Sequence, residues 1–204
     1  MHIPDKWDMD SLANKQQFIN EFGFATVVSQ DLEASHLPLL LVAEEGEFGV
    51  LYGHFARSNS HWQSVVDQPV VAIFSGPHSY ISPTWYHTQP AVPTWNYAAV
   101  HAFGKIELIG EQQTAEVLAI AIKKYEPEHS QDKDFIPKEY QQKLSKGIVG
   151  FKIVLTKIQG KEKLGQHRTP VDQLGVFNAL SVASDTDAKQ LFNYMLKRKL
   201  GTGN

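Results

Sequence analysis

The order of apolar and polar residues along the chain predicts a mainly β fold with helices at its periphery. Alternating or continuous apolar runs predict strands at 24–29, 36–42, 48–54, 70–74, 78–82, 98–109 and 148–158. Apolar residues at helical spacing predict helices at 11–22, 58–66, 114–125 and 137–146. The first three strands are expected to form an antiparallel meander, with a hairpin turn at 44–47. Because strands and helices seldom alternate, a doubly wound parallel sheet is not expected.

The last forty residues differ in character from the rest. Thr169-Pro170 is a helix cap followed by proline at the first helical position, and Ser184 with Asp187 resembles a capping box. Two helices are therefore predicted at 171–180 and 185–200. The predicted organisation is a β-barrel domain with inserted helices at 1–165 and a helical extension at 166–204, packed on the barrel or on a partner subunit.

Composition narrows the classes of function. The 204 residues carry a formal net charge of −3 and no cysteine, which excludes disulfides, thiolate metal sites and thiol nucleophiles. The negative charge and the lack of a clear helix-turn-helix weigh against direct DNA binding, which requires clustered Lys and Arg. The N-terminus lacks the layout of a signal peptide, and the longest apolar run, 37–43, contains Pro38. These features predict a soluble cytoplasmic protein without membrane contact.

The segment 53–62 is the first candidate site. Neither a Walker loop nor a Gly-x-Gly-x-x-Gly turn occurs, so a bound phosphate would need side chains and a helix start. A strand is predicted to run into a helix here, and the turn carries a fork of donors and short polar groups. The candidate residues are His54, Arg57, Ser58, Asn59 and Trp62. The alternative is an ordinary capped helix with a surface arginine.

Two Pro-Thr-Trp triplets, starting at Pro83 and Pro93, form the second candidate site. Aromatic faces can stack on a planar ring, and short polar side chains can bond its edge. The candidate residues are Ser82, Thr84, Trp85, Thr94, Trp95 and Asn96. The alternative is a rigid loop whose tryptophans pack under the barrel.

A third candidate is the junction 163–168, where Gln166 and Arg168 could reach a phosphate or a ring oxygen. A solvated basic turn is the alternative. The nine histidines show no His-x-x-x-His spacing, so no dedicated metal site is expected.

These segments resemble the PaiB family of FMN-binding negative transcriptional regulators. The resemblance is carried by the opening MHIP, by GHFA at 53–56, GPHSYISPTWY at 76–86, VPTWNYAAVH at 92–101, KGIVGFKI at 146–153 and KLGQ at 163–166. It implies a split β-barrel similar to pyridoxamine-phosphate oxidase, a homodimer, and two FMN sites at the subunit interface. It also implies that Arg57-Ser58-Asn59 holds the phosphate and that Arg168 contacts the flavin.

The function that this resemblance implies is negative regulation of transcription through a flavin-bound dimer. Two alternatives stay open: a small FMN-dependent oxidoreductase, and a heme-handling protein that uses the same cleft. Whether the chain is an enzyme is undecided, because any chemistry would be the flavin's own and no catalytic residue is indicated.

Overall fold

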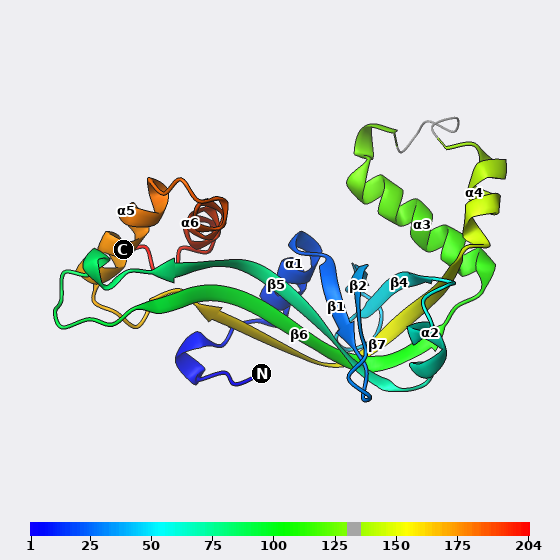
Figure 1. The fold of residues 1–204 in the computed structure, drawn as a ribbon, viewed down its shortest axis with the longest axis horizontal. Coiled ribbons are helices and arrows are strands. Elements are labelled where there is room, and N and C mark those ends of the chain that lie inside the picture. Colours follow the sequence, from blue (N-terminus) through cyan, green and yellow to red (C-terminus); the bar gives the residue numbers. More distant parts are fainter. Residues whose placement is uncertain (130–135) are drawn as a thin grey trace. The chain divides into compact units, whose positions relative to one another are not determined.

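A computed structural model describes residues 1–129 and 136–204. Seven strands form one sheet in the order β2-β1-β5-β6-β7-β4-β3 (Figure 1). The strands are β1 (Phe24–Val28), β2 (Ala34–Pro38), β3 (Leu40–Val42), β4 (Val50–Ala56), β5 (Pro69–Ile81), β6 (Thr94–Leu108) and β7 (Ile148–Lys163). The helices are α1 (Leu12–Glu21), α2 (His61–Ser64), α3 (Glu111–Tyr125), α4 (Lys138–Ser145), α5 (Pro170–Ser181) and α6 (Thr186–Arg198). Short 3₁₀ turns are η1 (Asp5–Trp7), η2 (Pro83–Trp85) and η3 (Pro127–His129).

The chain divides into two compact units, which are described separately below. The first unit contains Met1–Lys15, Ser75–Val100 and Gln159–Asn204. The second unit contains Gln16–Phe74 and His101–Ile158. Strands β5, β6 and β7 each contribute residues to both units.

In the second unit, one predicted strand is two strands. The expected strand 36–42 is interrupted at Leu39, so that β2 pairs with β1 and β3 pairs with β4. Pro38 has no N–H for a ladder, and the Leu39 N–H donates to the Gly23 carbonyl at 2.8 Å instead. Because β2 and β3 are the two edges of the sheet and only one residue separates them, the sheet curls back on itself. Both antiparallel pairings of the expected meander are therefore confirmed, including the β3–β4 hairpin. Its undivided middle strand is wrong, and the two pairs lie at opposite edges of the sheet.

The predicted strands 70–74 and 78–82 are a single strand, β5. Gly76 bounds the apolar run 70–74, and Pro77 follows it. The pairing of β1 with β5 ends at Phe74, so Pro77 lies beyond the residues that β1 engages. A proline is tolerated in a strand where no neighbour needs its N–H.

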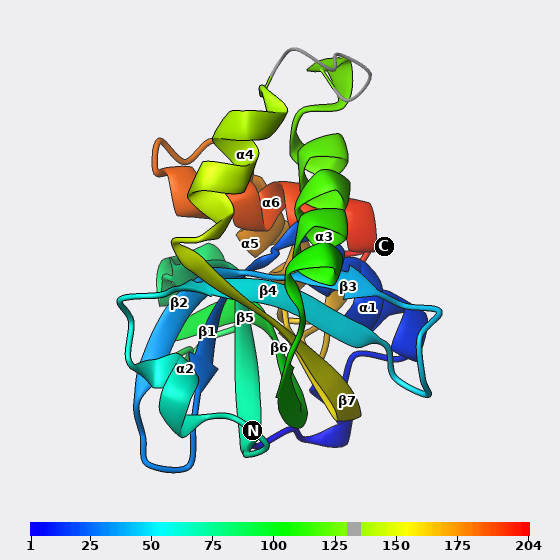
Figure 2. The ribbon, with the colours of Figure 1, turned by 90° about the vertical axis from the view of Figure 1, so that its right-hand side faces the viewer.

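Helices α3 and α4 lie together at one end of the second unit, and α3 packs on β4 (Figure 2). Beneath them the core is aromatic and aliphatic: Phe55 and Phe151 are fully buried, with ring centroids 4.7 Å apart. Helix α2 is one turn, shorter than the predicted 58–66, and its preceding residue Ser60 makes no capping bond through its side chain.

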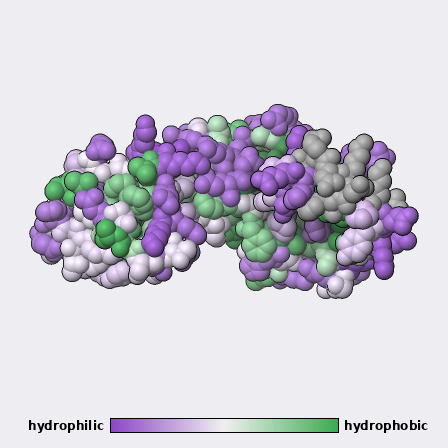
Figure 3. All heavy atoms as spheres, turned by 90° about the horizontal axis from the view of Figure 1, so that it is seen from above, coloured by the Kyte–Doolittle hydropathy of each residue, from purple (hydrophilic) through white to green (hydrophobic). Residues whose placement is uncertain are grey.

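In the first unit, α5 and α6 pack on each other, and α5 also packs on η2. The predicted Thr169 cap of α5 is confirmed, because Thr169 accepts from the Asp172 N–H. The predicted Ser184 cap of α6 is wrong by one residue, because Asp185 caps this helix and accepts from the Ala188 N–H. Leu180, Leu191 and Met195 fill the core between these helices. Apolar side chains also remain on their outer faces (Figure 3, left), namely Val171, Leu174, Val182 and Leu196. None of the helices in the described part of the chain has the length and apolar character needed to cross a membrane.

Candidate functional site

The turn after β4, in the second unit, is held by hydrogen bonds from its own candidate residues. Asn59 bridges two elements: its Nδ2 donates to Ser35 Oγ at 3.0 Å, and its Oδ1 accepts from the His61 N–H at 3.0 Å. The Trp62 indole N–H donates to the Arg57 carbonyl at 3.1 Å. Ser58 is exposed. This turn is therefore built as one rigid piece.

Arg57 is already engaged with the start of β7. Its Nε donates to the Lys146 carbonyl at 2.7 Å and its Nη2 to the Ile148 carbonyl at 2.8 Å. The guanidinium thus satisfies two carbonyls that would otherwise face solvent, while its exposed side keeps further donors for an anion.

Sequence reasoning did not anticipate the buried histidine beneath this turn. His61 is fully buried, with Nδ1 2.8 Å from Ser35 Oγ and Nε2 2.9 Å from Ser29 Oγ. The Ser29 hydroxyl in turn donates to Asp31. In residues 1–129 and 136–204 no three His, Asp or Glu side chains are grouped so as to hold a metal ion.

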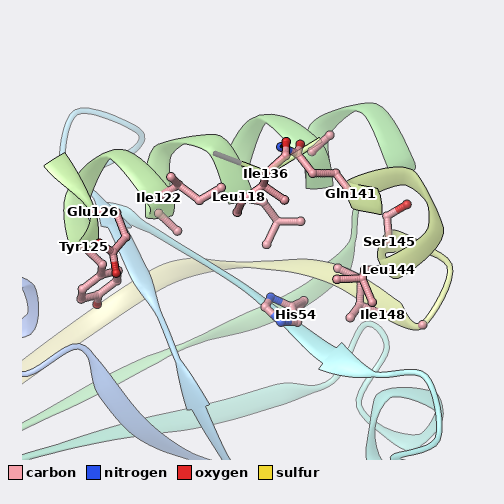
Figure 4. A pocket seen from close by; sticks show the side chains of 13 residues that line it. His54, Leu118, Ile122, Tyr125, Glu126, Ile136, Gln141, Leu144, Ser145 and Ile148 are labelled. Carbon is pink, nitrogen blue, oxygen red and sulfur yellow. The ribbon is translucent and has the colours of Figure 1, made fainter. Parts of the chain in front are cut away.

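His54 lines a cavity of about 880 Å³ between β4, α3 and α4 (Figure 4). Most of the wall is aliphatic, from residues such as Leu118, Ile122 and Ile148. Burial lowers the pKa of His54, so its imidazole is neutral at pH 7. No lysine or arginine is among the described residues that line the cavity. It therefore suits an apolar group and not a phosphate.

The two Pro-Thr-Trp triplets lie in the first unit and have different roles. Ser82 caps η2, accepting from the Thr84 N–H at 3.2 Å and pairing with the Thr84 hydroxyl at 2.8 Å. Trp85 is half-buried, and a Cβ added at Gly175 of α5 would lie 2.2 Å from its carbonyl oxygen. Trp85 thus lies against α5.

Trp95, at the start of β6, is 53% exposed and lies between two rings of β5. Its ring centroid is 6.1 Å from His78 and 6.2 Å from Tyr80. From β7, the Lys163 ammonium donates to the Thr94 hydroxyl and, at 2.7 Å, to the Trp95 carbonyl. We call the exposed rings of His78, Tyr80 and Trp95 the aromatic platform.

Next to Trp95 in the chain is a buried amide with an unused donor. Asn96 is 1% exposed, and no described residue accepts from its Nδ2. A buried N–H₂ without a partner costs about 1–3 kcal/mol, which a ligand oxygen can recover.

Gln166 and Arg168 stand in the turn between β7 and α5, also in the first unit. Gln166 shapes this turn: its Oε1 accepts from the Leu164 N–H at 2.8 Å and its Nε2 donates to the Glu162 carbonyl at 2.6 Å. The Arg168 guanidinium lies 4.8 Å from the Tyr86 ring centroid, and its buried Nε has no partner among the described residues.

The predicted site residues thus fall into two groups, each coherent within its own unit. His54, Arg57, Ser58, Asn59 and Trp62 belong to the second unit, and the remaining eight belong to the first. Lys163 lies in the candidate junction 163–168 but is not among the cofactor contacts predicted there. Trp7 and Lys6 carried no signal of a site in the sequence, because only folding brings η1 to the end of β7.

Comparison with known proteins bears on the family and the fold of this chain. A family model described as "Putative FMN-binding domain" matches residues 1–157. The chain is 36% identical over 203 residues to the Bacillus subtilis (strain 168) protein "Protease synthase and sporulation protein PAI 2", covering 96% of each. Among solved structures, the flavocytochrome Anf3 of Azotobacter vinelandii superimposes with a TM-score of 0.58 at 15% identity, over 80% of this chain and 73% of that one. The FAD and heme binding protein of Mycobacterium smegmatis gives a TM-score of 0.53 at 13% identity, over 78% and 74%.

The antiparallel seven-stranded half-barrel with peripheral helices is the split-barrel fold of flavin-binding proteins. This confirms the predicted fold class. The sequence match over most of the chain is more specific: the protein belongs to the PaiB family of FMN-binding-domain proteins.

The residues of the first unit fit a flavin. The aromatic platform offers exposed ring faces, and Asn96 Nδ2 and Arg168 Nε are buried donors without acceptors among the described residues. A flavin ring presents oxygen and nitrogen acceptors at its edge, so these donors match its chemistry.

Proposed function

We propose that this protein binds FMN and acts as a negative regulator of transcription through a flavin-bound homodimer. The observation that carries the proposal is the exposed Trp95, flanked by His78 and Tyr80 and followed by the unpaired Asn96 amide. Family membership supports the cofactor, and the regulatory role follows from the resemblance to the PaiB regulators.

In this proposal, the chain binds and orients the flavin, which supplies redox chemistry when bound. Trp85 and Trp95 provide aromatic faces, and Ser82, Thr84, Thr94 and Asn96 bond the ring edge. Gln166 and Arg168 contact the flavin from the turn after β7. From the second unit, Arg57, Ser58 and Asn59 supply the polar turn that the family resemblance assigns to the phosphate, and His54 and Trp62 are the further cofactor contacts proposed on either side of it.

The proposed regulation does not act through direct binding of DNA. The net charge is −3, and α6 carries Asp187 in its first turn and basic residues in its last turn. The helical extension 166–204 is proposed to pack on the barrel or the partner subunit, and the redox state of FMN to bias an interaction with another protein.

A heme-handling role is the second candidate, and His54 favours it. A neutral imidazole at the wall of an apolar cavity of about 880 Å³ has the chemistry of a heme ligand. A flavin-dependent oxidoreductase is the third candidate. It differs from the main proposal only in that the bound flavin oxidises or reduces a substrate.

The absorption spectrum of the purified protein is expected to show flavin bands, with FMN released by heat at one per subunit and identified by mass. Sedimentation should report a dimer. A Soret band that disappears in His54→Ala would favour heme handling. A colourless protein that takes up neither FMN nor heme on titration would refute both candidates.

Trp95→Ala is expected to weaken binding of FMN and of riboflavin alike, by about tenfold or more, because both share the ring that stacks on it. Quenching of flavin fluorescence measures both affinities. Phe24→Ala is the matched control, since Phe24 is an exposed aromatic residue on β1 of the second unit. Unchanged affinities in Trp95→Ala would remove the aromatic platform from the site.

A further inference from the structure

Five basic side chains gather around the rings of Trp7, Tyr86 and Tyr97 in the first unit, where η1, the end of β7 and the following turn meet. They come from positions about 155 residues apart in sequence. We call them, with the indole at their centre, the Trp7 cluster; its basic residues are Lys6, Lys161, Lys163, His167 and Arg168.

The distances within the Trp7 cluster are short. The ammonium groups of Lys6, Lys161 and Lys163 lie 4.7, 5.3 and 5.5 Å from the centroid of the Trp7 ring. The His167 ring meets the same indole edge-on at 5.6 Å. One cation is enough for a cation–π interaction with an indole. Each further ammonium group at the same ring is repelled by the others, so the arrangement leaves an excess of positive charge.

This positive charge is not neutralised by the protein. Within the described residues, no carboxylate forms an ion pair with any member of the cluster. Three acids adjoin members of the cluster in sequence. Glu162 is taken up by Arg198 at 2.7 Å and by the Tyr194 hydroxyl at 2.6 Å. Asp8 pairs with Lys15 at 3.5 Å, and Asp5 is exposed.

Burial and the repulsion between these cations lower the pKa values of Lys163 and His167. Burial, with the charges of Lys161 and Arg168, lowers the pKa of Lys163. Burial and three neighbouring cations of the cluster lower the pKa of His167. A nearby anion would reverse the charge part of both shifts.

Buried donors without acceptors point to the same chemistry. Trp7 Nε1 is buried and has no hydrogen-bond partner in the described residues. The same holds for Asn96 Nδ2 and Arg168 Nε, which the proposed function assigns to the flavin ring. All three are N–H groups, so only an acceptor can satisfy them, and Trp7 Nε1 is the one that the flavin ring does not use. The ammonium groups of Lys161 and Lys163 donate to backbone carbonyls, which hold these two side chains in place. These carbonyls do not neutralise the positive charge of the two lysines.

We propose that the Trp7 cluster binds the phosphate group of a small phosphate monoester. A phosphate dianion brings about two negative charges and three strong acceptor oxygens, which matches both the excess charge and the unused donor of Trp7. The phosphate has two possible sources. It is FMN's own phosphate, in which case this inference rests on the proposed function, or it belongs to a separate phosphorylated ligand that binds beside the flavin.

Inorganic phosphate titrated into the purified protein should raise the pKa of His167, followed by NMR of its ring protons and assigned with His167→Gln. The charges facing His167 come from Lys6 on η1, Lys163 on β7 and Arg168 in the same turn. KCl at matched ionic strength controls for screening. An unchanged pKa of His167 at saturating phosphate would overturn the proposal.

Lys6→Met tests the site with little risk to folding, because Lys6 is exposed. It should weaken phosphate by about tenfold or more and raise the pKa of His167 in the free protein. Lys157→Met is the matched control: Lys157 is an exposed lysine of β7 that lies over Phe103 in the second unit. Equal phosphate affinity in both variants would contradict the assignment.

FMN and riboflavin separate the two sources. If the bound phosphate is FMN's own, Lys6→Met weakens FMN but not riboflavin, and Arg57→Ala changes both flavins equally. If the ligand is separate, Lys6→Met weakens inorganic phosphate and neither flavin, while Arg57→Ala weakens FMN more than riboflavin. A phosphate effect on His167 in a protein that binds no flavin would refute the proposed function and support the cluster.

Discussion

Replacing Glu162 with alanine is expected to lower the free energy of unfolding by about 3–5 kcal/mol. The Glu162 side chain is 2% exposed and accepts from Arg198 Nε at 2.7 Å, from Arg198 Nη2 at 3.0 Å and from the Tyr194 hydroxyl at 2.6 Å. Its removal leaves a largely buried guanidinium and a buried phenol without their acceptor. Urea unfolding followed by circular dichroism measures the loss.

Asp10→Ala is the matched control, because Asp10 accepts from the same Arg198 at 3.3 Å but is 73% exposed. Surface ion pairs contribute little, so we expect a loss below about 1 kcal/mol. If the two truncations cost the same, Glu162 would not be the residue that ties α6 to β7.

Gly104→Ala is expected to destabilise the protein by about 3 kcal/mol, because a Cβ at this position of β6 has no room. It would lie 2.3 Å from the Val154 carbonyl oxygen and 2.7 Å from Ile153 Cγ2. A carbonyl cannot swing away as a flexible side chain can, so the strand itself must shift. Thermal and urea unfolding both report this effect.

Gly110→Ala provides the comparison, since a Cβ there meets no atom within 4 Å and the residue has φ −71°. As an N-cap position of α3, it should lose less than about 1 kcal/mol. A small effect at Gly104 would mean that β6 and β7 are not packed as closely as the contact distance implies.

Local patterns predicted most elements of this fold. The alternation at 98–109 predicted β6, and Thr169-Pro170 predicted the start of α5. Both signals act within a few residues: a strand's face is set by period-two burial, and a cap by one side chain and one N–H. Strand alternation and helix caps can therefore be predicted from the sequence alone.

The errors in the predicted strands arise from contacts between residues that are distant in sequence. Whether 36–42 is one strand or two depends on which neighbours its residues pair with, and those neighbours are distant in sequence. Likewise, Pro77 lies within β5 but beyond Phe74, where the pairing of β5 with β1 ends. Pairing partners are a property of the assembled sheet.

For the candidate site, too, some features follow from the sequence and others only from the tertiary structure. By itself the sequence determined the residue types that can bind a flavin, the two Pro-Thr-Trp triplets, the capped helices and the membership of a flavin-binding family. Only the tertiary structure decided that Arg57 is engaged by β7 carbonyls, that His54 faces an apolar cavity, and that η1 joins residues 161–168 to form the Trp7 cluster. Charge repulsion and unsatisfied donors arise from distances between groups, and distances between remote residues exist only after folding.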